Sequence, residues 1–145
     1  GSEAGTAELH PRPPVWRPEY VSGNEEMDRE HQELFGELSG FLTLFWQDGP
    51  QAHLTMAFDA LVDKCAAHFS SEEALLRAVG YPDADRHAAI HAQLLSRCEQ
   101  LRSSFAASPK ELLELMTGRL FETIVAHIVS ADLPFYPWLN AANQP

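Results

Sequence analysis

The stretch that decides the fold is residues 54–79, which read LTMAFDALVDKCAAHFSSEEALLRAV. One face recurs every three or four residues, as on an α-helix: Leu54, Phe58, Leu61, Cys65, His68, Glu72, Leu75 and Val79. His68 and Glu72 lie on that otherwise apolar face, four residues apart and therefore one above the other. Because an unsatisfied polar group is costly in a core, both side chains must find polar partners there.

Three further stretches have the same helical period, so the chain carries four amphipathic helices. The first begins near Asn24, the second spans about residues 52–79, the third opens near Asp83 and the fourth follows Ser108. Short connections between such helices predict an all-α fold. We expect an up-down-up-down antiparallel four-helix bundle with an extended N-terminal arm.

Capping and breaking residues set the predicted helix ends. Asn24 is an N-cap residue, and residues 80–82 (GYP) are a stop signal. Ser108 is predicted to cap the fourth helix, with Glu111 completing a capping box. Pro134 should end or kink that helix, because proline cannot continue the backbone hydrogen bonds.

Composition divides the chain into three parts. Residues 1–23 are predicted to be a tag remnant (Gly1 and Ser2) and an extended, proline-rich arm, whose Trp16 and Tyr20 should dock on the bundle. Residues 24–139 form the bundle and residues 140–145 a C-terminal tail. No start methionine follows the tag remnant, which favours a domain excised from a longer protein.

Several classes of function are excluded by composition. The chain has 145 residues, which suits one domain, and a net charge of −11 with scattered lysine and arginine, which argues against nucleic-acid binding. No apolar run is long enough for membrane insertion, and no secretory signal is present. The two cysteines form no disulfide framework, so we expect a cytoplasmic protein.

Five histidines and two acids form four clusters with helical spacing, one on each predicted helix: His31; His68 with Glu72; His87 with His91; and His127 with Asp132. Imidazole and carboxylate are the ligands of a borderline transition metal, with iron or zinc the best fit. A single inward histidine is ordinarily a core residue hydrogen-bonded to a neighbour. All seven together would bury too many polar groups without partners, whereas two metal ions would satisfy them jointly.

The residues of these clusters resemble the motifs of the hemerythrin family. Residues 27–35 (MDREHQELF) are similar to its first-helix motif, and residues 68–73 (HFSSEE), followed by GYP, to its second. His87-x₃-His91 and His127-x₄-Asp132 are similar to the third and fourth. The resemblance covers about residues 15–139 and is that of a bacterial hemerythrin or a hemerythrin-like domain.

The resemblance implies a non-haem di-iron centre that binds O2 reversibly, with a bridging oxo or hydroxo group. It implies that His87, His91 and His127 hold one iron and that His31 and His68 hold the other. Glu72 and Asp132 would bridge the two ions. The iron with two histidines would keep an open position for O2.

Three functions remain open on this resemblance. The first is O2 binding for storage, transport or scavenging. The second is O2 or redox sensing in a larger bacterial signalling protein, with a fused output domain or a homodimer as partner. An enzyme that removes peroxide or NO ranks last, because no dedicated acid or base accompanies the ligands. The chain also lacks the Glu-x-x-His pairs of ferritin-like di-iron oxygenases, so we expect no enzyme activity.

Four other metal-type residues are set aside. His53, in the first turn of the second helix, and His10, in the arm, are predicted to be solvated. Cys65 and Cys98 fall on inward faces of adjacent helices, and we prefer two small core residues over a redox-sensitive pair.

Overall fold

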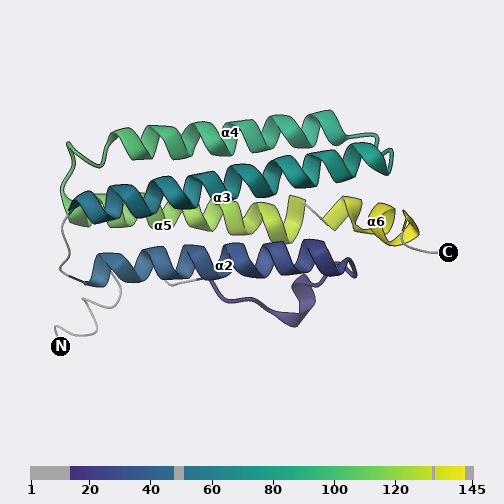
Figure 1. The fold of residues 1–145 in the computed structure, drawn as a ribbon, viewed down its shortest axis with the longest axis horizontal. Coiled ribbons are helices and arrows are strands. Elements are labelled where there is room, and N and C mark those ends of the chain that lie inside the picture. The colour runs from purple at the N-terminus through teal and green to yellow at the C-terminus, as the bar shows by residue number, and fades with distance from the viewer. Residues whose placement is uncertain (1–13, 48–50, 132, 143–145) are drawn as a thin grey trace.

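The fold is an antiparallel four-helix bundle, seen in a computed structural model that describes residues 14–47, 51–131 and 133–142. The long helices are α2 (Glu25–Trp46), α3 (Gln51–Ala78), α4 (Ala84–Ser103) and α5 (Lys110–Ala126). Each packs on the next in sequence, and α2 also packs on α5, which closes the bundle. Figure 1 shows the four helices side by side along the long axis, as the spacing of their apolar residues predicts. No helix in the described part of the chain has the length and apolarity to cross a membrane.

Capping residues begin and end the helices much as predicted. The Asn24 side chain accepts a hydrogen bond of 2.9 Å from the backbone N–H of Met27, at the N-terminus of α2. Helix α3 ends in a Schellman motif, in which the N–H groups of Gly80 and Tyr81 bond to the carbonyls of Arg77 and Leu76. The φ of Gly80 is +75°, a left-handed conformation that glycine adopts without strain.

The prediction of Ser108 as an N-cap is wrong. Helix α5 begins one residue later, with Pro109 as the N-cap and no side-chain hydrogen bond at that position. The extended ψ of Pro109 turns the chain, and its carbonyl accepts the first helical bond from Leu113. The N–H of Ser108 bonds instead to the Ser104 carbonyl, within the α4–α5 connection.

The fourth helix changes from an α-helix to a π-helix before it reaches Pro134. The α-helix ends at Ala126, and a π-helical segment, η2 (His127–Ala131), continues it. A 3-10 turn, η3 (Leu133–Phe135), and the short α6 (Tyr136–Ala142) follow. Because Pro134 has no N–H and restricts the residue before it, the α-helix cannot run through this point.

Two buried apolar clusters lie along the bundle. The larger fills the interior of the four long helices, and the smaller seals the end where α6 packs, around Met27, Leu76 and Phe135. The arm lies along α2, where Trp16 and Tyr20 both contact Phe35, as predicted. The polar residues that point into the bundle lie between these two apolar clusters.

Candidate metal centre

Six of the seven predicted ligands come together at one level of the bundle, and all six are buried. They are His31 from α2, His68 and Glu72 from α3, His87 and His91 from α4, and His127 from the start of η2. None is more than 6% exposed. The seventh, Asp132, lies outside the described residues.

The carboxylate of Glu72 lies between two groups of imidazoles. Its Oε1 is 2.7 Å from Nε2 of His87 and 3.2 Å from Nε2 of His91. Its Oε2 is 3.2 Å from Nε2 of His68 and 3.5 Å from Nε2 of His31. One carboxylate therefore faces a different group with each oxygen, which is the arrangement that a bridging ligand requires.

His127 joins the group on the Oε1 side. Its Nε2 lies 3.0 Å from Nε2 of His91, so two imidazole nitrogens face each other at hydrogen-bond distance. The donor atoms of Glu72, His87, His91 and His127 all lie within 4.8 Å of one another, and so do those of Glu72, His31 and His68. The structure thus divides the five histidines three to two about one carboxylate.

The electrostatics of this cluster fit a bound cation. Burial would raise the pKa of Glu72, but hydrogen bonds from the surrounding histidines outweigh it and hold the pKa well below its usual range. Burial would likewise lower the pKa of His68, yet hydrogen bonds to Glu30 and Glu72 raise it to about 9. Without metal, positive charge is therefore drawn to the centre as protons on imidazole. A metal ion can replace those inward protons, because Nε2 of a neutral imidazole is a ligand atom.

Two further carboxylates, which the sequence pattern did not single out, lie on the outer side of the centre. Glu30 Oε1 is 3.3 Å from Nδ1 of His68, and Glu73 Oε2 is 2.9 Å from Nδ1 of His91. Each of these two histidines therefore has an acidic partner at the nitrogen that points away from the centre. Their only signal in the sequence is position, since Glu30 precedes His31 and Glu73 follows Glu72.

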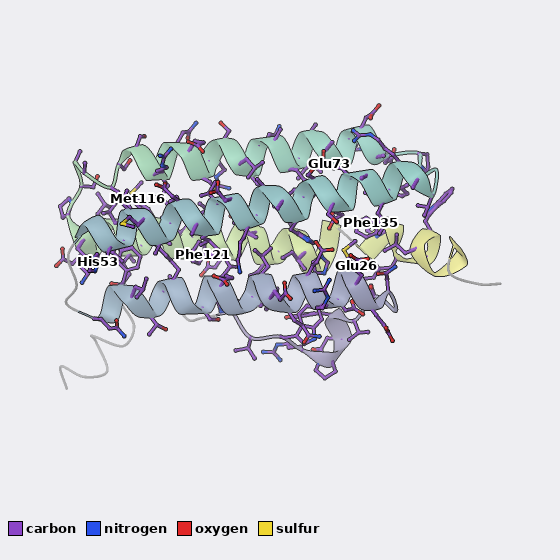
Figure 2. The ribbon with its side chains drawn as sticks, viewed as in Figure 1. Glu26, His53, Glu73, Met116, Phe121 and Phe135 are labelled. Carbon is purple, nitrogen blue, oxygen red and sulfur yellow. The ribbon has the colours of Figure 1, made fainter. Side chains whose placement is uncertain are left out.

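Aromatic rings enclose the centre. Phe69 stacks on His91 with ring centroids 4.0 Å apart, and Phe135 meets His87 edge-on at 5.3 Å. Trp16 of the arm lies 6.4 Å from His31. Figure 2 shows Phe135 toward the α6 end of the bundle and Glu73 between α3 and α4. Aromatic rings thus pack against His31, His87 and His91, while the two outer carboxylates contact His68 and His91.

The residues set aside behave as predicted where the structure describes them. His53 is exposed and lies at the opposite end of the bundle from Phe135 (Figure 2), whereas His10 lies outside the described residues. Cys65 and Cys98 are both buried. Burial raises the pKa of the Cys65 thiol to about 12 and that of Cys98 to about 11, so both remain protonated core residues.

Known proteins share both sequence and fold with this chain. Residues 22–139 match the family described as the hemerythrin HHE cation binding domain. The bacteriohemerythrin of Methylococcus capsulatus is 32% identical over 114 residues, which cover 79% of this chain and 86% of that protein. The bacteriohemerythrin of Campylobacter jejuni is 33% identical over 110 residues, covering 75% of this chain and 82% of that protein.

The likeness extends to an animal protein and to a solved structure. The myohemerythrin of Theromyzon tessulatum is 26% identical over 125 residues, covering 86% of this chain and 92% of that protein. The crystal structure of a leucine-to-alanine mutant of hemerythrin matches with a TM-score of 0.77 and 27% identity, covering 87% of this chain and 96% of that one. The chain therefore belongs to the hemerythrin family.

Proposed function

We propose that the chain is a non-haem di-iron protein that binds O2 reversibly. The observation that carries the proposal is the position of Glu72, whose two oxygens face three imidazoles on one side and two on the other. One metal ion on each side would be bridged by this carboxylate. The mixed imidazole–carboxylate donor set suits iron or zinc, and the likeness to hemerythrins favours iron.

The two ions have different ligand sets in this proposal. His87, His91 and His127 hold one iron, and His31 and His68 hold the other. Glu72 and Asp132 would be ligands of both ions, which would also share a solvent-derived oxo or hydroxo group. The assignment of Asp132 rests on the resemblance of His127-x₄-Asp132 to the fourth motif of the hemerythrin family.

The surroundings suit reversible binding. When bound, the two iron ions supply the electrons that O2 binding requires, and the side with two histidines leaves a position for O2. Glu72 and Asp132 offset part of the positive charge. On the side with two histidines, His31 and His68 are buried, with the Trp16 ring beside His31 and the Phe69 ring beside His68. An apolar surrounding of this kind hinders the escape of charged reduced oxygen species. We therefore propose O2 storage or transport, without turnover.

Iron content tests the ligand assignment. Metal-free protein is loaded with ferrous iron in the absence of O2, freed of excess metal and assayed. We expect two irons per chain in the wild type and in a His53→Ala control, whose exposed imidazole lies far from the centre. His87→Ala and His31→Ala should each reduce iron content by removing a ligand of one ion. Wild-type protein that retains one iron or none would contradict the proposal.

A further inference from the structure

The outer nitrogens of two proposed ligands each face one carboxylate that no ligand assignment uses. Glu30 reaches His68 from α2, and Glu73 reaches His91 from the same helix as Glu72. Both histidines are at most 5% exposed, whereas the side chains of Glu30 and Glu73 are each 21% exposed. Each pair therefore runs from the buried centre outward to the bundle surface.

An ionised carboxylate has only acceptor atoms, so the imidazole must be the donor in both pairs. A hydrogen on Nδ1 leaves Nε2 of a neutral imidazole as the atom with the free lone pair. For His68 and His91, Nε2 is also the atom that faces Glu72. The outer carboxylates thus select the tautomer that a metal ion at the centre needs.

We propose that Glu30 and Glu73 are positioning residues of the metal centre, Glu30 for the iron of His31 and His68 and Glu73 for the iron of His87, His91 and His127. This inference rests on the proposed di-iron site. Each carboxylate holds one ring in the plane and tautomer that binds metal, and raises the donor strength of Nε2. The three-to-two division of histidines is thereby matched by one outer carboxylate on each side.

The two pairs differ in their surroundings. Glu30 borders a surface groove of about 200 Å³, lined also by Glu33, Leu34, Lys64, Ala67 and His68. Its second oxygen lies 3.5 Å from the Ser71 hydroxyl. The shorter Glu73–His91 pair is accompanied by the Phe69 ring stacked on the same imidazole. Glu73 thus acts on a ring that packing already constrains, and Glu30 on a ring beside solvent.

The test compares Glu30→Ala and Glu73→Ala with matched controls on exposed glutamates, Glu33→Gln and Glu122→Gln. The first readout is the release of iron from reduced, fully loaded protein to an excess of a ferrous chelator without O2. Each alanine variant should release one of its two irons about 10- to 100-fold faster. The double variant should release both quickly, because the two carboxylates act on different ions.

The second readout is NMR of the zinc-loaded protein, which needs no redox chemistry. The ring Nδ1–H protons of His68 and His91 should exchange slowly with water in the wild type. Glu30→Ala should expose only the His68 proton, and Glu73→Ala only that of His91. Glu30→Gln and Glu73→Gln keep an acceptor oxygen and should fall between wild type and alanine, which provides variants that fold even if an alanine variant does not.

The outcomes separate this inference from the proposed function. Unchanged release rates and unchanged proton exchange, in variants that still hold two metal ions, would overturn the positioning role and leave the di-iron site intact. If the double variant released only one iron quickly, the assignment of Glu30 and Glu73 to different ions would be overturned. Wild-type protein that binds no pair of metal ions would overturn the proposed function and this inference with it.

Discussion

The ring of Phe69 lies flat on the imidazole of His91, with centroids 4.0 Å apart and planes 9° from parallel. Phe69 is buried and follows His68 directly in α3. One turn of this helix therefore supplies a proposed ligand and, at the next residue, the ring that fixes the plane of a histidine on α4. Packing and ligand geometry are coupled at this point.

Replacing Phe69 by leucine should therefore weaken both the fold and the metal site. We expect the free energy of unfolding of the metal-free protein to fall by roughly 0.5–3 kcal/mol, as for most core substitutions. Phe105→Leu is the matched control, because Phe105 is equally buried but packs on Phe58 and Phe41. Denaturant melts should show similar losses, whereas iron release should accelerate in Phe69→Leu alone. Equal release rates would show that the stack has no effect on the metal.

Glu72→Gln should reduce iron content more than any other single change at the centre. It removes the negative charge that faces both groups of imidazoles and weakens the proposed bridge. Glu114→Gln provides a control, since Glu114 is also buried but lies in the N-terminal half of α5. Iron assays after gel filtration should find two irons per chain in the control and fewer in Glu72→Gln. Full iron content in Glu72→Gln would count against the bridge.

The metal-free protein should lose stability as the pH rises through the range 6.5 to about 9. The folded chain raises the pKa of His68 to about 9 through hydrogen bonds that outweigh its burial. Because His68 binds its proton more tightly in the folded state, that proton stabilises the folded state. The stabilisation is complete below pH 6.5, the ordinary pKa of histidine, and is lost as the pH rises to the folded-state pKa of about 9. The loss is at most roughly 3 kcal/mol. Urea unfolding at about pH 6 and about pH 9.5 measures it, and His68→Gln should flatten the difference.

The metal-loaded protein should show the opposite trend. Metal binding needs neutral imidazole, so each ion displaces protons and binds more tightly as the pH rises. The melting temperature of the zinc-loaded protein should therefore increase between about pH 6 and about pH 8, while that of the metal-free protein does not. Parallel pH curves for the two forms would mean that the metal does not bind at these imidazoles.

Asp132→Asn tests the ligand that lies outside the described residues. As a second bridge, Asp132 should resemble Glu72, so the variant should hold less iron than the wild type. Asp85→Asn is the control, because its side chain is 97% exposed on the surface of α4. Normal iron content in Asp132→Asn would leave Glu72 as the carboxylate bridge and call for another ligand.

The bundle could be predicted from sequence because its signals are local. Apolar spacing defines the four helices, and residues such as Asn24 and Gly80 define their ends. Helix α5 begins one residue later than the sequence predicts, because Pro109 is the N-cap residue and the Ser108 side chain does not cap the helix. The π-helical segment from His127 could not be predicted, since no local preference distinguishes it from an α-helix that meets Pro134.

The inner part of the site was predictable and its outer part was not. His68 and Glu72 can be identified as candidate ligands from the sequence, because they are polar residues on an otherwise apolar helix face. Glu30 and Glu73 lie on partly exposed faces rich in other acids, so nothing in the spacing distinguishes them from solvated residues such as Glu33. Only the packing of α2 and α4 against α3 brings them to His68 and His91.

The central claim is reversible O2 binding at a di-iron site, and an absorption spectrum tests it most directly. Iron-loaded protein is reduced, exposed to air and then purged of O2. We predict a charge-transfer band that appears with O2, disappears on purging and returns on re-exposure. A protein that holds two irons but passes in one step to a stable oxidised form, with no band that purging removes, would contradict the account.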